Sequence, residues 1–402
     1  MADSLQVSVF YLPSIGSRGE IEKGMAGLRD DLYQRMLLEL REQSQLAEEL
    51  GYDSISFTEH HFHVEGFEIS NNPVLLDLFV ALNTKRIRVG QLGIVLPAQN
   101  PLRVAEDIAM LDHMSGGRAN AGFARGYQRR WVDVMAQQLH GIQGATPGQH
   151  DEIDRVNREA FEEHFQIIKR AWTEEMIDFH GTFWQIPPAG IPWSMEATRA
   201  WGAGVDERSI VRQIGVVPKP LQKPHPPLFQ PFASSENTIR WCARENVTAI
   251  LPPMYLALQN RLYEVYQEEA AACGRKLAPG EGLGVLRDVV VADTEEEALE
   301  LWAHGPAFCG AAWFAPFGFD RVLREPERTT PLTPQDLLER ALILVGTPDT
   351  VSRQMETLLG QTPVRWLFAW TYNGLVPHAK LMRSLELFAT KVLPRFRDGA
   401  SV

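Results

Sequence analysis

Residues 89–126, VGQLGIVLPAQNPLRVAEDIAMLDHMSGGRANAGFARG, contain a complete strand–helix–strand repeat. Apolar and small residues fill 87–96 and 119–123, and between them Leu102–Met114 carries apolar residues at helical spacing. Pro101 stands at the start of this helix, where a missing N–H is tolerated. Two extended segments joined by a helix predict neighbouring parallel strands with the helix packed outside the sheet.

The same alternation continues on both sides of this stretch. Strands are expected at 7–11, 54–58, 87–96, 119–123, 228–232, 248–251, 284–291 and 365–370. Helices are expected at 32–50, 73–82, 102–114, from 236, and at 255–272, 294–302, 349–359 and 377–393. Eight strand–helix steps favour a closed (β/α)₈ TIM barrel, an α/β fold, over an open doubly wound sheet. We expect one such domain to span residues 1–402.

Two insertions account for the length that the barrel does not need. The first, at about 141–172, begins as a Gly-rich loop and continues as a long helix with apolar positions at helical spacing. The second, at about 187–227, is rich in Pro, Gly and Trp. The tryptophans in and beside the second insertion, Trp184, Trp193 and Trp201, favour a small-molecule apolar substrate that is bulky.

Composition excludes several classes of partner. The chain has 402 residues, a formal net charge of −12 and no cluster of Lys and Arg, so we expect no nucleic acid partner. No segment is long and apolar enough to span a bilayer, so we expect no membrane partner. The three cysteines form no CxxC pair and are typical of free thiols in a reducing, cytoplasmic compartment.

The stretch SISFTEHHFH, residues 54–63, joins the end of an expected strand to a Glu and three His. The carboxyl ends of barrel strands are where such folds place catalytic residues. A metal site is not expected, because in a continuing strand His61 and His63 would point one way and His60 the other. The alternative is a solvated loop of imidazoles. GxGxxG, Walker, HExxH and GxSxG motifs are absent from the chain.

Five stretches of the chain, considered together, resemble one known family. Taken in order, they resemble the bacterial luciferase-like flavin-dependent monooxygenases, a family of (β/α)₈ barrels that bind reduced flavin mononucleotide. These stretches are GYDSISFTEHHF (51–62), residues 89–126, PLFQPFASSENTIRW (227–241), VGTPDTV (345–351) and YNG (372–374).

The resemblance implies a phosphate site for FMN. Arg125 follows the fourth expected strand, and a polar cluster opens the helix after the fifth, namely Ser234, Ser235, Asn237 and Thr238. Family members bind the flavin phosphate with the matching Arg and the matching Ser/Thr cluster. Hydroxyls and amide groups at a helix N-terminus attract an anion. The alternative for this cluster is a plain helix cap.

The resemblance also assigns residues to the flavin ring. In luciferases the positions that match Leu92 and Gly93 are joined by a cis peptide beneath the ring. The position that matches His60 lies in the flavin cavity and acts in proton transfer, a role that suits imidazole near neutral pH. His61 orients His60, lines the same pocket or has a structural role only, and Glu59 is expected to fix the tautomer of His60. The alternative for Gly93 is an ordinary strand glycine.

The implied reaction uses molecular oxygen as co-substrate. Reduced flavin (FMNH2) forms a C4a-(hydro)peroxide, which oxygenates a substrate by hydroxylation, aldehyde oxidation or Baeyer–Villiger insertion. A separate NAD(P)H:flavin reductase would supply the reduced flavin, and the family favours a homodimer. A lid is expected at about 305–328, where Trp313, Phe314 and Phe317 either face the substrate or pack within the loop.

Departures from the luciferases leave other functions open. Luciferases carry Cys at the position of Ala124, and the expected lid does not match theirs, so light emission from a long-chain aldehyde is not expected. One alternative is a coenzyme F420-dependent oxidoreductase on the same barrel, which would transfer hydride and need no oxygen. The other is a non-catalytic flavin-binding protein.

Overall fold

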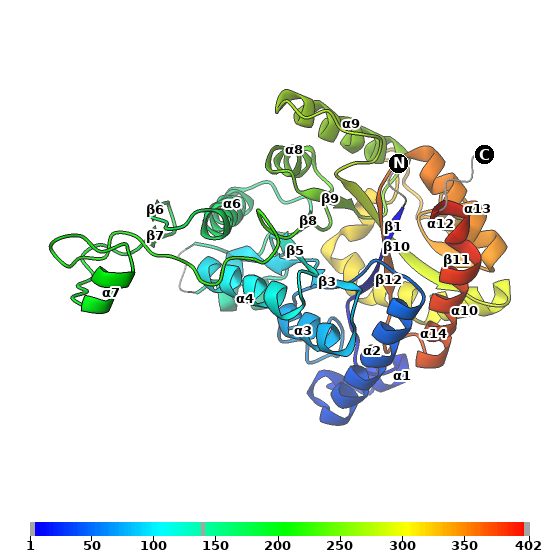
Figure 1. Cartoon of the computed structure of the whole chain (residues 1–402). Coiled ribbons are helices and arrows are strands. Elements are labelled where there is room, and N and C mark those ends of the chain that lie inside the picture. The colour runs from blue at the N-terminus through cyan, green and yellow to red at the C-terminus, as the bar shows by residue number, and fades with distance from the viewer. Residues whose placement is uncertain (1–4, 138–140, 398–402) are drawn as a thin grey trace. The chain divides into compact units, whose positions relative to one another are not determined.

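The computed structural model describes residues 5–137 and 141–397 (Figure 1). The contacts within the chain divide these residues into two compact units. Unit 1 contains residues 5–94, 120–123 and 228–397, and unit 2 contains 95–119 and 124–227 except 138–140. The two units are described in turn.

Within the described residues, eight parallel strands close into a barrel, which confirms the predicted (β/α)₈ fold. The barrel order is β1–β2–β3–β5–β8–β9–β10–β12, and β12 pairs with β1 to close the ring. These strands are β1 (Gln6–Tyr11), β2 (Ser54–Phe57), β3 (Arg88–Gln91), β5 (Ala119–Ala124), β8 (Leu228–Gln230), β9 (Thr248–Leu251), β10 (Leu283–Val291) and β12 (Trp366–Thr371). The strand predicted at 87–96 is divided into β3 and the short β4 (Ile94–Val95). β11 (Leu344–Gly346), which was not predicted, pairs with the end of β10.

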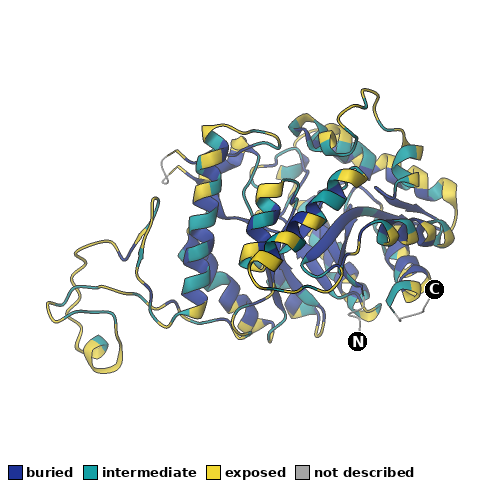
Figure 2. Ribbon diagram, turned by 90° about the horizontal axis from the view of Figure 1, so that it is seen from above, coloured by how far each residue is buried: buried dark blue, intermediate teal, exposed yellow. Residues whose placement is uncertain are grey.

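The barrel strands are buried on both faces, as Figure 2 shows by their dark colour. All four residues of β2 and all six of β12 are buried. Strands of a parallel barrel face the barrel interior on one side and the helices on the other, so they carry nearly continuous apolar sequences. This is why these strands could be predicted from short apolar runs alone.

The helices of unit 1 follow the predicted pattern. α2 buries Leu32, Met36 and Leu40 along one face, and Asn72 caps α3 by accepting a hydrogen bond from the Leu75 amide. The longer helices are α2 (Asp30–Glu49), α3 (Pro73–Asn83), α8 (Glu236–Glu245), α9 (Leu256–Ala272), α10 (Glu295–His304), α13 (Pro348–Gln361) and α14 (His378–Leu387). The shorter ones are α1 (Arg18–Ile21), η1 (Ala26–Leu28), α12 (Pro334–Glu339), η6 (Phe388–Val392) and α15 (Pro394–Arg397).

The segment at 305–328, predicted as a lid, is a chain of helical turns. Its elements are α11 (Pro306–Cys309), η3 (Gly310–Phe314), η4 (Ala315–Phe317) and η5 (Phe319–Val322). The Pro and Gly residues that suggested an open loop occupy helix starts and a left-handed turn at Gly318. We call residues 305–328 the lid segment below.

The backbones of β3 and β5 approach each other where β3 ends. A Cβ added to Gly93 would lie 2.6 Å from the carbonyl carbon of Gly122 and from the Phe123 amide nitrogen. A Cβ added to Gly122 would lie 2.2 Å from the Gln91 carbonyl oxygen. Both contacts are with backbone atoms, so this part of the barrel has no room for a side chain at either glycine.

Unit 2 is built around α4 (Pro101–Met114) and α6 (Glu152–Thr173), and Trp172 of α6 donates its indole N–H to the Ala105 carbonyl of α4. Trp193 and Trp201, in the second insertion, are 46% and 88% exposed, so they give no support to a closed apolar pocket there. The other elements are η2 (Leu96–Ala98), α5 (Arg129–Met135), β6 (Phe179–His180), β7 (Gln185–Ile186) and α7 (Glu196–Trp201).

No helix in the described part of the chain is long and apolar enough to cross a membrane. The cysteines are free thiols, with Cys242 and Cys309 buried and Cys273 exposed.

Candidate active site

Three of the predicted site segments lie at the carboxyl ends of barrel strands in unit 1. His60 follows β2, Leu92 and Gly93 follow β3 directly, and Ser234 follows β8. Carboxyl ends of parallel barrel strands share one rim, which is the face where barrels of this kind build active sites. Because β2 and β3 are neighbours, the first two segments start from adjacent points of that rim.

His60 is buried and held through both ring nitrogens. Its Nδ1 lies 3.0 Å from the Thr58 hydroxyl, and its Nε2 lies 3.3 Å from Oε1 of Glu68. Burial, together with the nearby His63 and His61, lowers the pKa of His60 well below 6.5, so the ring is neutral at pH 7. A carboxylate only accepts hydrogen bonds, so the proton of neutral His60 lies on Nε2 and Nδ1 accepts from Thr58.

Glu68 connects His60 to the lid segment. Its side chain is 1% exposed and accepts a 2.5 Å hydrogen bond from the Trp313 indole N–H. His63 lies 3.5 Å from the same carboxylate, and its Nδ1 donates to the Phe67 carbonyl at 2.8 Å. The His63 ring packs against the indole of Trp313, with 4.9 Å between ring centroids. A buried carboxylate therefore gathers two imidazoles and one indole, and we call these four residues the histidine cluster.

The sequence argument against a convergence of the histidines assumed that they continue a strand, with alternate side chains on opposite sides. They do not continue it. β2 ends at Phe57, so the chain turns before the histidines, and both His60 and His63 reach Glu68. His63, to which the resemblance gave no role, thus belongs to the cluster. Among the described residues, no group of three or more His, Cys, Asp or Glu could hold a metal ion.

Glu59 pairs with the second histidine of the stretch. Its Oε1 lies 2.9 Å from Nε2 of His61. Glu59 is 2% exposed, so this pair is buried next to the cluster. Sequence reasoning missed Glu68 because it lies on a loop eight residues beyond His60, and no periodicity relates the two positions.

A cavity of about 210 Å³ opens beside the histidine cluster. His60, His63 and Glu68 line it together with Tyr33 and Phe62. We call it the histidine cavity. Its wall brings a neutral imidazole and a carboxylate to the same small space, an arrangement that can accept and return a proton.

The peptide between Leu92 and Gly93 is cis, as the resemblance implies. Just before it, the Gln91 side chain donates a 2.5 Å hydrogen bond to Oδ2 of Asp77, a buried residue of α3. Burial raises the pKa of Asp77 well above 3.8. The segment after β3 is therefore fixed on one side by a buried polar contact and on the other by the close backbone of β5.

The polar cluster after β8 forms the start of α8. Ser235 is the N-cap: its hydroxyl accepts from the Thr238 amide at 3.3 Å and donates to the Thr238 hydroxyl at 3.0 Å. Ser234 is half-buried and Asn237 is exposed. The helix cap considered as an alternative is thus present. A cap does not exclude an anion at the same helix end, because the other first-turn amides remain available.

Arg125 belongs to unit 2, where it lies against α6. Its Nη2 donates a 2.5 Å hydrogen bond to Asp154, and Arg158 lies 3.6 Å from the same carboxylate. Its Nη1 is buried and has no hydrogen-bond partner. Burial and the nearby Arg158 lower the pKa of Arg125. A half-buried guanidinium with one buried, unsatisfied N–H fits a negatively charged oxygen from a ligand.

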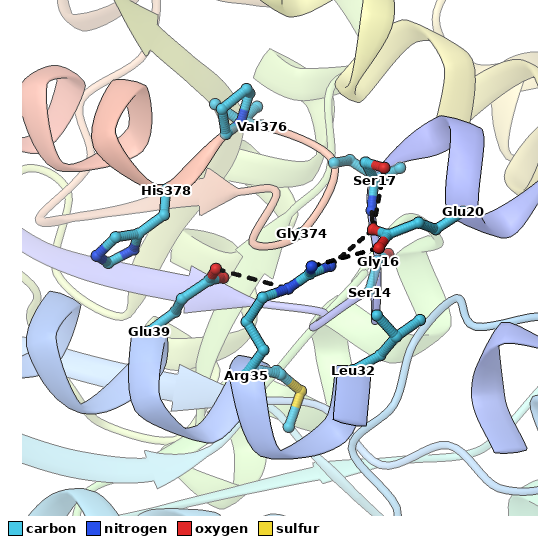
Figure 3. Close-up of a pocket in the computed structure, with 13 residues that line it drawn as sticks. Ser14, Gly16, Ser17, Glu20, Leu32, Arg35, Glu39, Gly374, Val376 and His378 are labelled. Atoms are coloured by element: carbon cyan, nitrogen blue, oxygen red, sulfur yellow. Dashed lines mark hydrogen bonds and ion pairs between the residues drawn. The ribbon is translucent and has the colours of Figure 1, made fainter. Parts of the chain in front are cut away.

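A second cavity, of about 460 Å³, lies between the end of β1 and the start of α14 (Figure 3). Its cation, Arg35, donates to both carboxylate oxygens of Glu20 at 3.3 and 2.7 Å. In the close-up, the Arg35 guanidinium points to Glu20 and lies beside Glu39. Two carboxylates neutralise this cation, so the cavity is poorly suited to a phosphate.

The chain is similar in sequence to proteins of known activity. The sequence model of the luciferase-like monooxygenase family matches residues 25–365. The 3,6-diketocamphane 1,6-monooxygenase of Pseudomonas putida is 26% identical over 377 residues, which cover 87% of this chain and 90% of that protein. The oxygenase component of the trigonelline monooxygenase of Acinetobacter baylyi is 26% identical over 276 residues, which cover 68% of this chain and 65% of that protein.

The solved structures include the oxygenating constituent of 3,6-diketocamphane monooxygenase from Pseudomonas putida in complex with FMN. It superposes with a TM-score of 0.74 at 22% identity and covers 98% of this chain and 99% of that one. At this identity the likeness concerns the fold. The family match over most of the sequence goes further, and the chain belongs to the luciferase-like monooxygenase family.

Proposed function

We propose that this chain is the oxygenase of a two-component monooxygenase, which uses FMNH2 and molecular oxygen to oxygenate a small apolar substrate. The observation that carries the proposal is the buried, neutral His60 at the carboxyl rim of the barrel, held by Glu68 and Thr58 beside the Leu92–Gly93 segment. A proton acceptor that is shielded from water is what oxygen activation on a reduced flavin requires from the protein.

The residues present fit the flavin phosphate and ring. In unit 2, Arg125 offers a buried N–H without a partner to a phosphate oxygen. In unit 1, Ser234 and the first amides of α8 offer short donors at a helix N-terminus. The Leu92–Gly93 peptide, at the end of β3, stands where the resemblance places the flavin ring. Reduced flavin, when bound, supplies the electrons that activate dioxygen.

The chain's own residues manage protons and exclude water. Nδ1 of His60 connects through the Thr58 hydroxyl to the Ser70 hydroxyl at 3.0 Å, a short path for a proton. Glu68 keeps the other ring proton on Nε2. The lid segment, which donates to Glu68 through Trp313, would shield the site when closed and admit substrate when open. His61, held by Glu59 at 2.9 Å, would orient His60 or line the same pocket.

The partners belong to the same proposal. One relative is named an oxygenase component, which supports delivery of reduced flavin by a separate NAD(P)H:flavin reductase. The chain carries no nicotinamide-binding motif of its own. A cytoplasmic homodimer remains a proposal that rests on the family resemblance.

Rapid mixing tests this function. The protein is mixed with reduced FMN without oxygen, then with oxygenated buffer, and flavin reoxidation is followed by absorbance. We expect reoxidation to differ from that of free FMN and the difference to disappear in His60→Ala, which should still bind FMN. Reoxidation at the rate of free FMN, with tight binding of reduced coenzyme F420 instead, would favour the dehydrogenase. Tight FMN binding with no oxygen consumption would favour a flavin-binding protein.

A further inference from the structure

A third cavity, of about 210 Å³, lies in unit 1 on the helix side of β10. Arg287 of β10 and Gln259 of α9 both line it, and Nη2 of Arg287 donates a 2.8 Å hydrogen bond to the Gln259 side chain. Arg287 therefore points away from the barrel interior, toward the surrounding helices. Arg340 and Glu325 line the same space. We call it the arginine cavity.

Arg287 is a buried cation, and no carboxylate of the described chain is among its hydrogen-bond partners. It is 1% exposed and donates to the carbonyls of Ala341 and Leu286 as well as to Gln259, each at 2.8 Å. A guanidinium has five N–H groups, so these three bonds leave two donors unused. Burial lowers the pKa of Arg287 to about 9, which the charge of Asp288 partly offsets, so the group is charged at pH 7.

The neighbouring carboxylate on β10 does not serve as the partner of this cation. Asp288 directly follows Arg287 on the strand, so the two side chains point to opposite faces. Oδ1 of Asp288 accepts from the Tyr372 hydroxyl at 2.9 Å, and Oδ2 accepts from the Trp302 indole at 3.1 Å. Both oxygens are therefore engaged elsewhere. A buried charge without a paired charge is costly, and an anion in the cavity would relieve that cost.

The start of α9 adds the positive end of a helix dipole. Tyr255, the N-cap, and Leu256, the first helical residue, both line the cavity. The Tyr255 side chain makes no capping hydrogen bond, and the first turn contains no acidic residue. The first amides of this 17-residue helix thus lack the partners that caps and acidic side chains commonly provide. Beside a buried guanidinium, such amides favour a negatively charged group.

A second cation in the wall is only loosely held. Nη1 of Arg340 donates to both carboxylate oxygens of Glu325, at 2.8 and 3.0 Å. The two side chains are 35% and 41% exposed, so their pairing is weak and water can replace it. Of the described residues that line the cavity, Arg287, Arg340 and Glu325 are the charged ones, which gives the cavity a net positive charge.

We propose that the arginine cavity binds a small oxyanion, a phosphate ion or a short carboxylate, held by Arg287, by Arg340 and by the first amides of α9. The volume equals that of about seven water molecules at roughly 30 Å³ each, which suits an ion of this size and is too small for a flavin. The site shares no residue with the flavin phosphate site proposed at Arg125 and the start of α8, and it does not rest on the proposed function.

Calorimetric titration with sodium phosphate and with sodium acetate, at pH 7 and constant ionic strength, tests the proposal. We expect at least one of the two anions to bind with a dissociation constant below about 1 mM. Binding of phosphate alone would identify a tetrahedral oxyanion, and binding of acetate alone would identify a carboxylate. Arg340→Gln should weaken binding about 10- to 150-fold, because a charge-assisted hydrogen bond is lost. Arg353→Gln, at an exposed position of α13 that does not line the cavity, should leave binding unchanged.

Glu325→Gln gives the opposite prediction. Without the competing carboxylate, binding should strengthen about two- to fivefold, a gain that a merely destabilised variant would not show. Glu327→Gln, at an exposed position of the same segment, is the matched control. Binding of neither anion, equal effects of the paired variants, or weaker binding in Glu325→Gln would each overturn the proposal. Phosphate binding that is lost in Arg125→Met and unchanged in Arg340→Gln would belong to the flavin phosphate site and would overturn it as well.

Discussion

Replacement of Glu68 by Gln tests whether the histidine cluster is the functional centre. The change keeps the size of the side chain and replaces one carboxylate oxygen with an NH2 group. In the native cluster the Trp313 indole, the His60 ring and the His63 ring approach the two carboxylate oxygens at 2.5, 3.3 and 3.5 Å. A single amide oxygen cannot serve them all, and the amide NH2 would face donors.

The magnitude follows from the bonds that change. Hydrogen bonds to a charged group contribute about 1.5–3 kcal/mol and neutral ones about 0.5–1.5 kcal/mol. If the Trp313 bond becomes neutral and the His60 bond is lost, the free energy of unfolding should fall by about 2–4 kcal/mol. The preference for a proton on Nε2 of His60 is lost as well. Flavin reoxidation in the presence of the protein should therefore approach that of free FMN.

The matched control is Glu59→Gln, the same chemical change at a buried carboxylate. Glu59 bonds to His61 at 2.9 Å, and an amide oxygen can take over that bond. Urea unfolding and stopped-flow reoxidation are compared for both variants and for Glu68→Gln combined with Trp313→Phe. If Glu68→Gln behaves like Glu59→Gln, or if its effect and that of Trp313→Phe simply add, the cluster does not work as one unit and this reasoning is wrong.

Three further outcomes are expected. Arg125→Met should weaken FMN binding about 10- to 150-fold and leave riboflavin binding unchanged, as measured by calorimetry, because only the phosphate uses the buried N–H; equal loss for both flavins would contradict a phosphate role. Gly93→Ala should lower the free energy of unfolding by about 1–3 kcal/mol, since its Cβ would lie 2.6 Å from backbone of β5, whereas Gly360→Ala, which meets no atom within 4 Å, should not. Burial raises the pKa of Asp288 from 3.8 to about 6, so its contribution to stability is complete below the unfolded value and is lost as the pH rises through about 6. Asp288→Asn should lack this loss in urea unfolding between about pH 4 and 8, and a wild-type-like profile would refute the assignment.

The barrel was predictable because buried parallel strands and amphipathic helices leave strong local patterns. β12 and β10 are apolar over nearly their whole length, and α2 places an apolar residue on one face at each turn. Strand ends were less predictable. The third strand was predicted to run to Leu96, but β3 ends at Gln91, just before the cis peptide. Side-chain periodicity carries no signal for a change in backbone geometry at a glycine.

The site was only partly predictable for a related reason. His60 could be singled out because three histidines after a strand are conspicuous in one short stretch. Its partner Glu68 could not be singled out, because it reaches His60 through a loop. The indole of Trp313 could not be singled out either, because Trp313 lies 245 positions away from Glu68, which it contacts. Such contacts depend on how the chain returns to the rim, which residue spacing does not encode.

Two consecutive residues of the lid segment contact different parts of the barrel rim. Trp313 and Phe314 are consecutive, yet Trp313 bonds to Glu68 of the histidine cluster and Phe314 packs on Trp370 of β12. Adjacent side chains on helical turns point about 100° apart, so one turn can contact both sites. A movement of this turn away from Trp370 would therefore also strain the hydrogen bond from Trp313 to Glu68. On this geometry, the packing of the lid segment on β12 and the position of Glu68 beside His60 are linked through a single peptide unit.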